Sequence, residues 1–219
     1  MIKGILFDMD GTLLDSERYY MDYVYTILDK YECTKAYDLA YSIIGTTAKN
    51  SYKILSDILD NKVSAEDLNI ECTKFYKDNP INILEYTFNN VKDIIIELYN
   101  SSIRLAICSS SATDDINHFI NELDIDEYIE YKISGLDLDE SKPNPEIYLR
   151  ALKELNLNKD EVIIYEDSYS GILAGNRANI YTIAREELRY NIDQRKANKI
   201  IKDINELREY VSGENKWKK

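Results

Sequence analysis

The chain has 219 residues and carries 40 acidic against 27 basic side chains, which gives a formal net charge of −13. This acidic balance argues against nucleic acid or an anionic membrane as a partner, because both attract positively charged surfaces. No apolar run approaches the roughly 20 residues that span a bilayer, and no segment resembles a signal peptide.

The first predicted element is a buried strand over residues 2–7, where the sequence IKGILF is short and mostly apolar. Asp8 and Asp10 follow it directly. Because side chains alternate between the faces of a strand, these two carboxylates point the same way at its carboxyl end. Two like charges there cost free energy unless a cation or a reaction requires them. The pair is therefore the first candidate for a functional site.

Helical periodicity dominates from residue 17 to about residue 85, and no strand is evident there. Ser16 is the predicted N-cap of the first helix, which has apolar residues at the i, i+3, i+4 and i+7 spacing. A second helix is predicted over residues 50–59. A third follows Ser64, its predicted N-cap, with Asp67 in a capping-box position. We expect these helices to form an all-helical domain, residues 16–85.

Strands and helices alternate in the rest of the chain. The predicted strands cover residues 103–109, 131–134, 161–167 and 180–184. The predicted helices lie around 91–98, at 113–123, from Asn144-Pro145 onward, with Leu149, Leu152 and Leu155 buried, and at 171–178. Near-continuous apolar strands separated by helices predict an α/β fold with a doubly wound, Rossmann-like parallel sheet. The core domain is then residues 1–15 and 86–219, with the helical domain inserted into it.

The predicted strands end in side chains suited to a phosphate and a cation. The side chains at or soon after these ends are Asp8, Asp10, Ser109, Ser110, Lys142, Glu166 and Asp167. Ligands of doubly wound sheets bind at the carboxyl ends of the strands, so we expect these groups to converge. Carboxylate oxygens suit Mg²⁺, whereas a hydroxyl and an ammonium suit phosphate oxygens.

Cysteine and histidine contribute little to this chemistry. Cys33, Cys72 and Cys108 are odd in number and share no C-x-x-C spacing, as expected of reduced thiols in a cytoplasmic protein. His118, the single histidine, has no partner at metal-ligand spacing, and we interpret it as a surface or capping residue. We therefore expect a monomeric cytoplasmic enzyme whose chemistry is carried by carboxylates.

Four motifs resemble those of the haloacid dehalogenase superfamily over nearly the whole chain: DMDGT at 8–12, CSSS at 108–111, SKPNPEIY at 141–148 and YEDSYSGI at 165–172. An isolated DxDG could belong to a calcium loop, but the third acidic position of an EF-hand is missing. The subgroup resembled most contains β-phosphoglucomutases and small-metabolite phosphatases. A dehalogenase is disfavoured because its chemistry uses no metal and does not call for Asp10. A non-enzymatic module is disfavoured because every motif residue is intact.

The resemblance implies roles for the charged and hydroxyl residues at the predicted strand ends. Asp8 is expected to be the nucleophile that accepts the phosphoryl group, and Asp10 the general acid and base. Ser109, Ser110 and Lys142 are expected to hold the phosphoryl oxygens.

The cofactor implied by the resemblance is Mg²⁺. Its expected ligands are Asp8, Asp167 and the backbone carbonyl of Asp10. Glu166 is expected either to reach the metal through a water molecule or to orient Lys142.

The helical domain resembles the family's cap, which closes over the site and selects the substrate, here a small phosphorylated metabolite. Its candidate specificity residues are Tyr20, Thr46, Thr47 and Lys49. The mutases carry an arginine where this chain has Ala48 and a histidine where it has Tyr20, and the adjacent Lys49 is only a point charge. These differences favour a phosphatase, with a β-phosphoglucomutase-type phosphosugar mutase as the alternative. The cap tyrosines are either cap core or a surface that stacks on a sugar or nucleoside.

Overall fold

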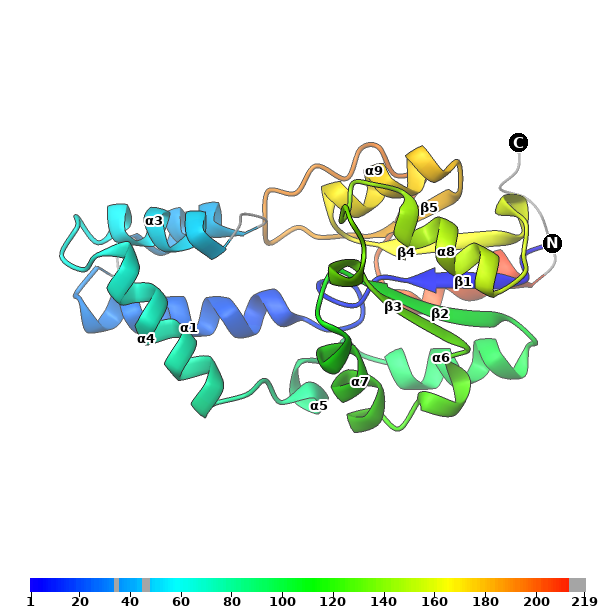
Figure 1. Ribbon diagram of the computed structural model, residues 1–219, viewed down its shortest axis with the longest axis horizontal. Coiled ribbons are helices and arrows are strands. Elements are labelled where there is room, and N and C mark those ends of the chain that lie inside the picture. The colour runs from blue at the N-terminus through cyan, green and yellow to red at the C-terminus, as the bar shows by residue number, and fades with distance from the viewer. Residues whose placement is uncertain (34–35, 45–47, 213–219) are drawn as a thin grey trace. The chain divides into compact units, whose positions relative to one another are not determined.

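The computed structural model describes residues 1–33, 36–44 and 48–212, which belong to two structural units (Figure 1). The α/β unit comprises Met1–Asp15, Ile83–Leu188 and Ile192–Lys219. The helical unit comprises Ser16–Asn82 and the short segment Arg189–Asn191. Within the described ranges, no helix combines the length and the apolar character needed to cross a membrane.

The α/β unit is built on a six-stranded sheet in which all neighbouring strands are parallel. In spatial order the strands are β3 (Tyr131–Ser134), β2 (Arg104–Ser109), β1 (Gly4–Phe7), β4 (Val162–Glu166), β5 (Tyr181–Arg185) and β6 (Lys199–Ile201). The central strands β1, β2 and β4 are apolar and buried almost throughout, as expected of a parallel sheet covered on both faces. The fold class predicted from the sequence is confirmed.

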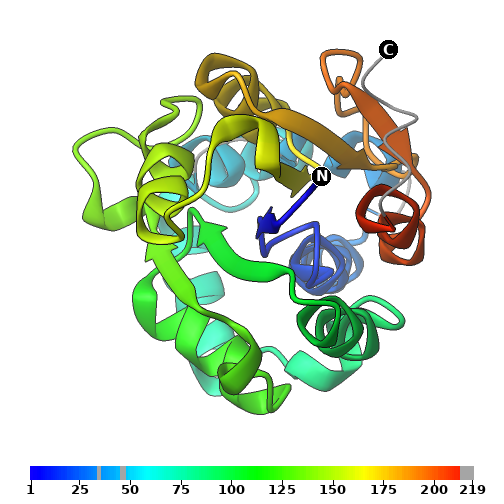
Figure 2. The same cartoon turned by 90° about the vertical axis from the view of Figure 1, so that its right-hand side faces the viewer.

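Helices cover both faces of the sheet, α8 and α9 on one side and α6 and α7 on the other (Figures 1 and 2). Their bounds are Val91–Asn100 for α6, Thr113–Glu122 for α7, Glu146–Glu154 for α8 and Tyr169–Ala178 for α9. Tyr148 of α8 belongs to the same buried core cluster as Leu6 of β1 and Ile164 of β4. The unit also contains α5 (Ile83–Tyr86), α10 (Arg208–Val211) and the 3-10 turns η3 (Asp126–Tyr128), η4 (Gly135–Asp137), η5 (Lys159–Glu161) and η6 (Ile204–Leu207).

Three details of this unit differ from the expectation. The strand β6 was not predicted, because it has only three residues and the first two are exposed. Helix α8 begins at Glu146, and Asn144 lies outside it, where its side chain accepts a hydrogen bond from the Glu146 backbone N–H (2.9 Å). Leu149 is 36% exposed, so the prediction that it is buried was wrong, and Tyr148 fills the inner face instead.

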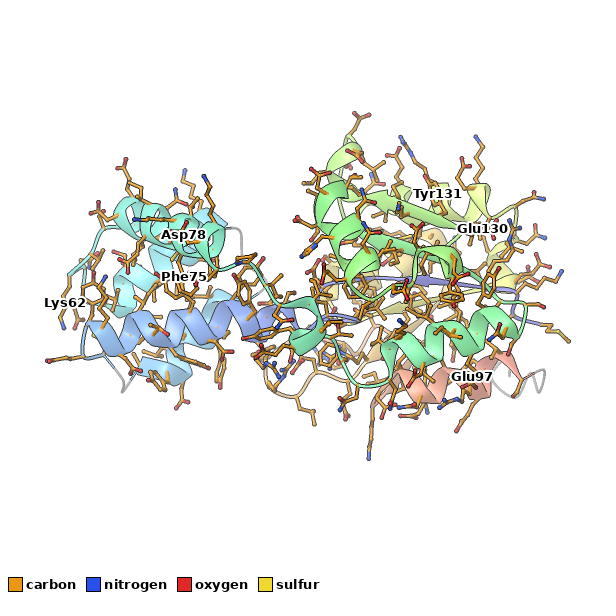
Figure 3. All side chains as sticks on the ribbon, turned by 90° about the horizontal axis from the view of Figure 1, so that it is seen from below. Lys62, Phe75, Asp78, Glu97, Glu130 and Tyr131 are labelled. Atoms are coloured by element: carbon orange, nitrogen blue, oxygen red, sulfur yellow. The ribbon has the colours of Figure 1, made fainter. Side chains whose placement is uncertain are left out.

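The helical unit consists of α1 (Ser16–Lys30), α2 (Tyr37–Ala40), the 3-10 turn η2 (Tyr41–Ile43), α3 (Ala48–Ile58) and α4 (Ala65–Asp78). Its core joins the apolar faces of these helices. The ring of Phe75 on α4, labelled in Figure 3, stacks on Tyr23 of α1 with 3.5 Å between centroids. Helix α4 begins where predicted, because the Ser64 hydroxyl accepts a hydrogen bond from the Asp67 backbone N–H (3.1 Å). The described part of this unit contains no strand.

The sheet order places β1 at the point where the winding of the chain reverses. In the register, Phe7 of β1 is paired with Ile107 of β2 and with Tyr165 of β4. The residues that follow Phe7 and Tyr165, namely Asp8 and Glu166, therefore emerge side by side at the carboxyl edge of the sheet. Ligands of doubly wound sheets bind at such a switch point.

Candidate active site

Three carboxylates meet at the carboxyl ends of β1 and β4. Asp8 follows β1, Glu166 is the last residue of β4, and Asp167 comes next. One ligand oxygen from each of the three lies within 4.8 Å of the others. All three residues are buried, with Glu166 fully inaccessible to solvent. Parallel pairing of two central strands thus produces the convergence expected from the sequence for this part of the site.

Lys142 supplies the positive charge that contacts this carboxylate cluster. It lies between η4 and α8, and its side chain is only 3% exposed. The Lys142 ammonium donates hydrogen bonds to Asp8 Oδ1 (2.5 Å) and to Glu166 Oε1 (2.9 Å). One cation therefore bridges the residues that end β1 and β4.

Both oxygens of Glu166 are held in place by hydrogen bonds. Oε2 accepts from the backbone N–H groups of Asp167 (2.8 Å) and Ser168 (2.7 Å), and Oε1 accepts from the Tyr148 hydroxyl (3.1 Å) as well as from Lys142. The first turn of α9 closes over this carboxylate, because a Cβ placed on Gly171 would lie 1.5 Å from Glu166 Oε1. Glu166 was expected either to reach a metal through water or to orient Lys142, and the structure contains its contact with Lys142.

Asp10 has a different environment from Asp8. Its Oδ2 accepts hydrogen bonds from the hydroxyls of Ser109 (3.2 Å) and Ser111 (2.5 Å) at the end of β2. Ser110 is exposed. The sequence analysis singled out Ser110 and missed Ser111, although the alternation that pairs Asp8 with Asp10 also places Ser109 and Ser111 on one side.

Thr12 and Gly11 contact the aspartates of the cluster. The Thr12 hydroxyl lies 3.1 Å from Asp8 Oδ2 and 2.9 Å from Asp167 Oδ1, so its proton can be donated to either. Gly11 has φ = 77°, and a Cβ there would lie 2.4 Å from Asp167 Oδ2. Only glycine allows both this backbone conformation and this close approach. Thr12 lies in the DMDGT motif, but the resemblance implied no role for it.

Burial dominates the electrostatics of the cluster. It raises the pKa of Asp8 from 3.8 to about 7, against the opposing charge of Lys142. Burial, together with the charges of Glu166 and Asp8, also raises the pKa of Asp167 well above its usual value. Burial would lower the pKa of Lys142, but the neighbouring Asp8 and Glu166 hold it well above 10.5. Negative charge in this site is therefore only partly balanced by the protein.

These features fit a hard divalent cation. The available ligand atoms are all oxygens, they converge from Asp8, Glu166 and Asp167, and they are shielded from solvent. Mg²⁺ and Ca²⁺ prefer such carboxylate ligands, and a bound cation would offset the burial and the repulsion that together raise the pKa of Asp8 and Asp167.

The other candidate residues lie in the helical unit or outside the described residues. Tyr20 of α1 is 47% exposed and lines a cavity of about 340 Å³ within the helical unit. Lys49 is exposed on α3. Thr46 and Thr47 lie outside the described residues. His118 is exposed on α7, in keeping with its interpretation as a surface residue.

Comparison with known proteins adds a family and several relatives. The model of the haloacid dehalogenase-like hydrolase family matches residues 5–185. A phosphorylated carbohydrates phosphatase of Thermotoga maritima is 27% identical over 190 residues, which cover 83% of this chain and 84% of that protein. A phosphoglycolate phosphatase of Colwellia psychrerythraea is 28% identical over 187 residues, 82% of each chain.

Solved structures share the whole architecture. The crystal structure of a β-phosphoglucomutase from Clostridium difficile superposes with a TM-score of 0.67 at 24% identity, and the match covers 97% of this chain and 96% of that one. At this level of identity the similarity establishes a common fold.

Proposed function

Because the chain belongs to the haloacid dehalogenase-like hydrolase family, we propose that it is a Mg²⁺-dependent phosphatase of small phosphorylated metabolites that acts through a phosphorylated Asp8. The observation that carries the proposal is the buried cluster of Asp8, Glu166 and Asp167 in contact with the Lys142 ammonium. The two relatives described above are named as phosphatases, which supports hydrolysis of a phosphate ester as the reaction.

In the first step, a carboxylate oxygen of Asp8 attacks the phosphorus atom, and the bond between phosphorus and the leaving oxygen breaks. The protonated amine of Lys142 offsets negative charge on the phosphoryl oxygens, from a position fixed by Glu166. Asp10 gives a proton to the leaving oxygen. The product of this step is an acyl phosphate on Asp8 and a free alcohol.

In the second step, Asp10 removes a proton from a water molecule, which attacks the phosphorus atom and restores the Asp8 carboxylate. The surroundings of Asp10 support this separate role, because it is hydrogen-bonded to Ser109 and Ser111 and stands apart from the three clustered carboxylates. The same hydroxyls are available to phosphoryl oxygens when substrate is bound.

We propose that Asp8, Asp167 and the Asp10 backbone carbonyl hold Mg²⁺. When bound, the cation would supply positive charge next to the transferring phosphoryl group. Glu166 is assigned to the orientation of Lys142, because both of its oxygens are already engaged by Lys142, Tyr148 and backbone N–H groups.

The substrate we propose is a monophosphate with an uncharged organic part. The family resemblance assigns substrate selection to the helical unit, whose cavity is lined by Tyr20, Tyr52 and Tyr76 among mostly apolar residues. Its described lining contains no lysine or arginine, and Glu17 is its charged member. A second anionic group on the substrate would find no cationic partner there, whereas tyrosine rings can stack on a sugar or a base.

The phosphosugar mutase remains the alternative because Lys49 lies next to Ala48 at the start of α3. A mutase must orient a sugar phosphate by holding its distal phosphate, and correct orientation is worth about 7–11 kcal/mol at best. A single exposed lysine would orient the distal phosphate less strongly than an arginine that binds it through two hydrogen bonds. Water is therefore expected to accept the phosphoryl group.

The test is a screen of phosphorylated metabolites with Mg²⁺, in which released phosphate is measured for the wild type and for Asp8→Asn. We expect release from sugar or nucleoside monophosphates, little release from phosphoglycolate, and none from the variant or with excess chelator. Turnover in chelator, or by Asp8→Asn, would contradict the proposal. β-Glucose 1-phosphate with a trace of the 1,6-bisphosphate tests the alternative, since faster formation of glucose 6-phosphate than of phosphate would indicate a mutase.

A further inference from the structure

Arg185, the last residue of β5, is buried close to the active site, and none of the roles proposed above uses it. Its Nε donates a hydrogen bond to the backbone carbonyl of Gly11 (2.6 Å). Nη2 donates to Glu187 Oε2 (2.7 Å), and Nη1 donates to the carbonyl of Glu186 (3.1 Å). The guanidinium also lies over the ring of Phe88, 4.2 Å from its centroid. Each of the three guanidinium nitrogens thus donates a hydrogen bond.

Gln194 contacts the backbone after β4, as Arg185 contacts the backbone after β1. Its Nε2 donates to the backbone carbonyls of Asp167 (2.7 Å) and Arg185 (2.7 Å), and its Oε1 accepts from the Glu187 backbone N–H (3.1 Å). Gln194 and Glu187 are each only 6% exposed, and Arg185 is 8% exposed. These three buried residues form one hydrogen-bonded network, called here the Arg185 clamp.

We infer that the Arg185 clamp positions the two backbone segments that carry the metal-site aspartates, with Arg185 holding Gly11 and Gln194 holding Asp167. The inference rests on the proposed function of Asp8, Asp10 and Asp167. Arg185 and Gln194 are positioning residues, because they reach the site only through backbone carbonyls.

Two physical features make such a clamp necessary. The clustered carboxylates repel one another when ionised, so the segments after β1 and β4 are pushed apart when Lys142 is the only cation in contact with them. The same segments are in close contact, because a Cβ on Gly11 would lie 2.4 Å from Asp167 Oδ2. A small movement of Gly11 therefore displaces Asp167, and a misplacement of 1 Å can lower a rate by about 10²-fold.

The geometry also predicts which substitutions matter. Lysine at position 185 would keep the positive charge but would lose the planar fork that contacts Gly11, Glu186 and Glu187 at once. Methionine at position 194 would keep the approximate volume of glutamine but remove both N–H donors and the acceptor. Arg195, whose side chain is 88% exposed and paired with Asp193, offers a matched control one residue from the clamp.

The experiment compares Arg185→Lys, Gln194→Met and Arg195→Lys in the full chain. Two quantities are measured: Mg²⁺ affinity by calorimetry, and kcat and KM per folded molecule, with the folded fraction taken from circular dichroism. For Arg185→Lys we expect kcat to fall roughly 10- to 100-fold while the substrate KM changes little, together with weaker Mg²⁺ binding. Arg195→Lys is expected to match the wild type.

A second variant distinguishes positioning from general stabilisation. Arg185→Ala leaves space beside a cavity of about 220 Å³ that Arg185, Thr12 and Phe88 line, so free guanidinium at millimolar concentration can enter. Recovery of kcat with guanidinium, without a rise in the folded fraction, would support the clamp. Wild-type kcat and Mg²⁺ affinity in folded Arg185→Lys would overturn it. If the wild type hydrolyses no phosphomonoester, the proposed function fails, whereas the calorimetric comparison still tests the clamp.

Discussion

At the scale of single residues, the site gives different surroundings to two aspartates that are one residue apart in the sequence. Asp8 lies among two other carboxylates and the Lys142 ammonium, whereas Asp10 faces the hydroxyls of Ser109 and Ser111. Different surroundings are what a nucleophile and a proton-transfer group require.

Substitution of each aspartate should therefore stop the reaction at a different stage. Asp8→Asn should prevent formation of the acyl phosphate altogether. Asp10→Asn should still allow slow phosphorylation of Asp8 by a substrate with a good leaving group, while hydrolysis of the acyl phosphate falls by about 10²–10⁴-fold. Acid-quenched labelling with a ³²P substrate measures both steps. Equal labelling of the two variants would contradict the assignment.

Gly171 should be the glycine whose replacement damages the site most specifically. In Gly171→Ala the new Cβ would meet Glu166 Oε1 at 1.5 Å, so Glu166 and the Lys142 bound to it must move. We expect a loss of about 1–3 kcal/mol in the free energy of unfolding, together with a lower kcat. Gly135→Ala is the control, because its Cβ would lie 3.4 Å from the nearest atom. Chemical denaturation and steady-state kinetics measure the two effects.

Strand position alone does not separate the site residues that could be predicted from those that could not, because Arg185 is also the last residue of a strand. Asp8 and Asp167 could be predicted because motif and strand end coincide, and Lys142 could be predicted from its motif alone. The roles of Arg185 and Gln194 could not be predicted, because the sequence alone does not distinguish a buried polar side chain from an exposed one. Their roles become visible only in the folded structure, where they donate hydrogen bonds to the carbonyls of Gly11 and Asp167.

At the scale of elements, the buried strands and the strongly periodic helices were predictable, and the exceptions have identifiable causes. The strand β6 has three residues, which is too short for a period to be recognised. On α8 the three leucines suggested the buried face, and Leu152 and Leu155 are buried, but Tyr148 is buried in place of Leu149. The buried positions of this segment still follow helical spacing, namely Ile147, Tyr148, Ala151, Leu152 and Leu155, so only the assignment of Leu149 to the buried face was wrong.

The N-cap of α4 can be tested by a single substitution. Ser64→Ala removes the hydroxyl that accepts from the Asp67 N–H, which should lower stability by about 0.5–2 kcal/mol. Lys74→Ala, an exposed position inside the same helix, should change stability by less than about 0.5 kcal/mol. Urea unfolding followed by circular dichroism compares the two variants. Equal losses would show that the cap contributes nothing specific.

At the scale of the whole molecule, the buried carboxylates should make stability depend on both pH and metal. Burial raises the pKa of Asp8 from 3.8 to about 7, so between these values the folded state holds a proton that the unfolded state has lost. The free energy of unfolding must then fall as pH rises through this range. In chelator we therefore expect a lower melting temperature at pH 8 than at pH 5.

Added Mg²⁺ should reverse this trend, since it binds the deprotonated carboxylates of the folded state. The expected result is a larger rise in melting temperature at pH 8 than at pH 5. Asp167→Asn should show less pH dependence and little response to Mg²⁺, whereas Asp57→Asn, on the exposed surface of α3, should behave like the wild type. A metal response of equal size in Asp167→Asn would contradict the assignment of the site.

The position of β1 in the sheet has a consequence for synthesis on the ribosome. Its partners β2 and β4 begin at Arg104 and Val162, after the whole of Ser16–Asn82 has been made. During translation β1 is therefore an apolar segment without a partner, while the helices that follow it can already form local contacts. Asp8 emerges early from the ribosome, yet the surroundings of its proposed catalytic role are complete only when Glu166 and Asp167 have been added.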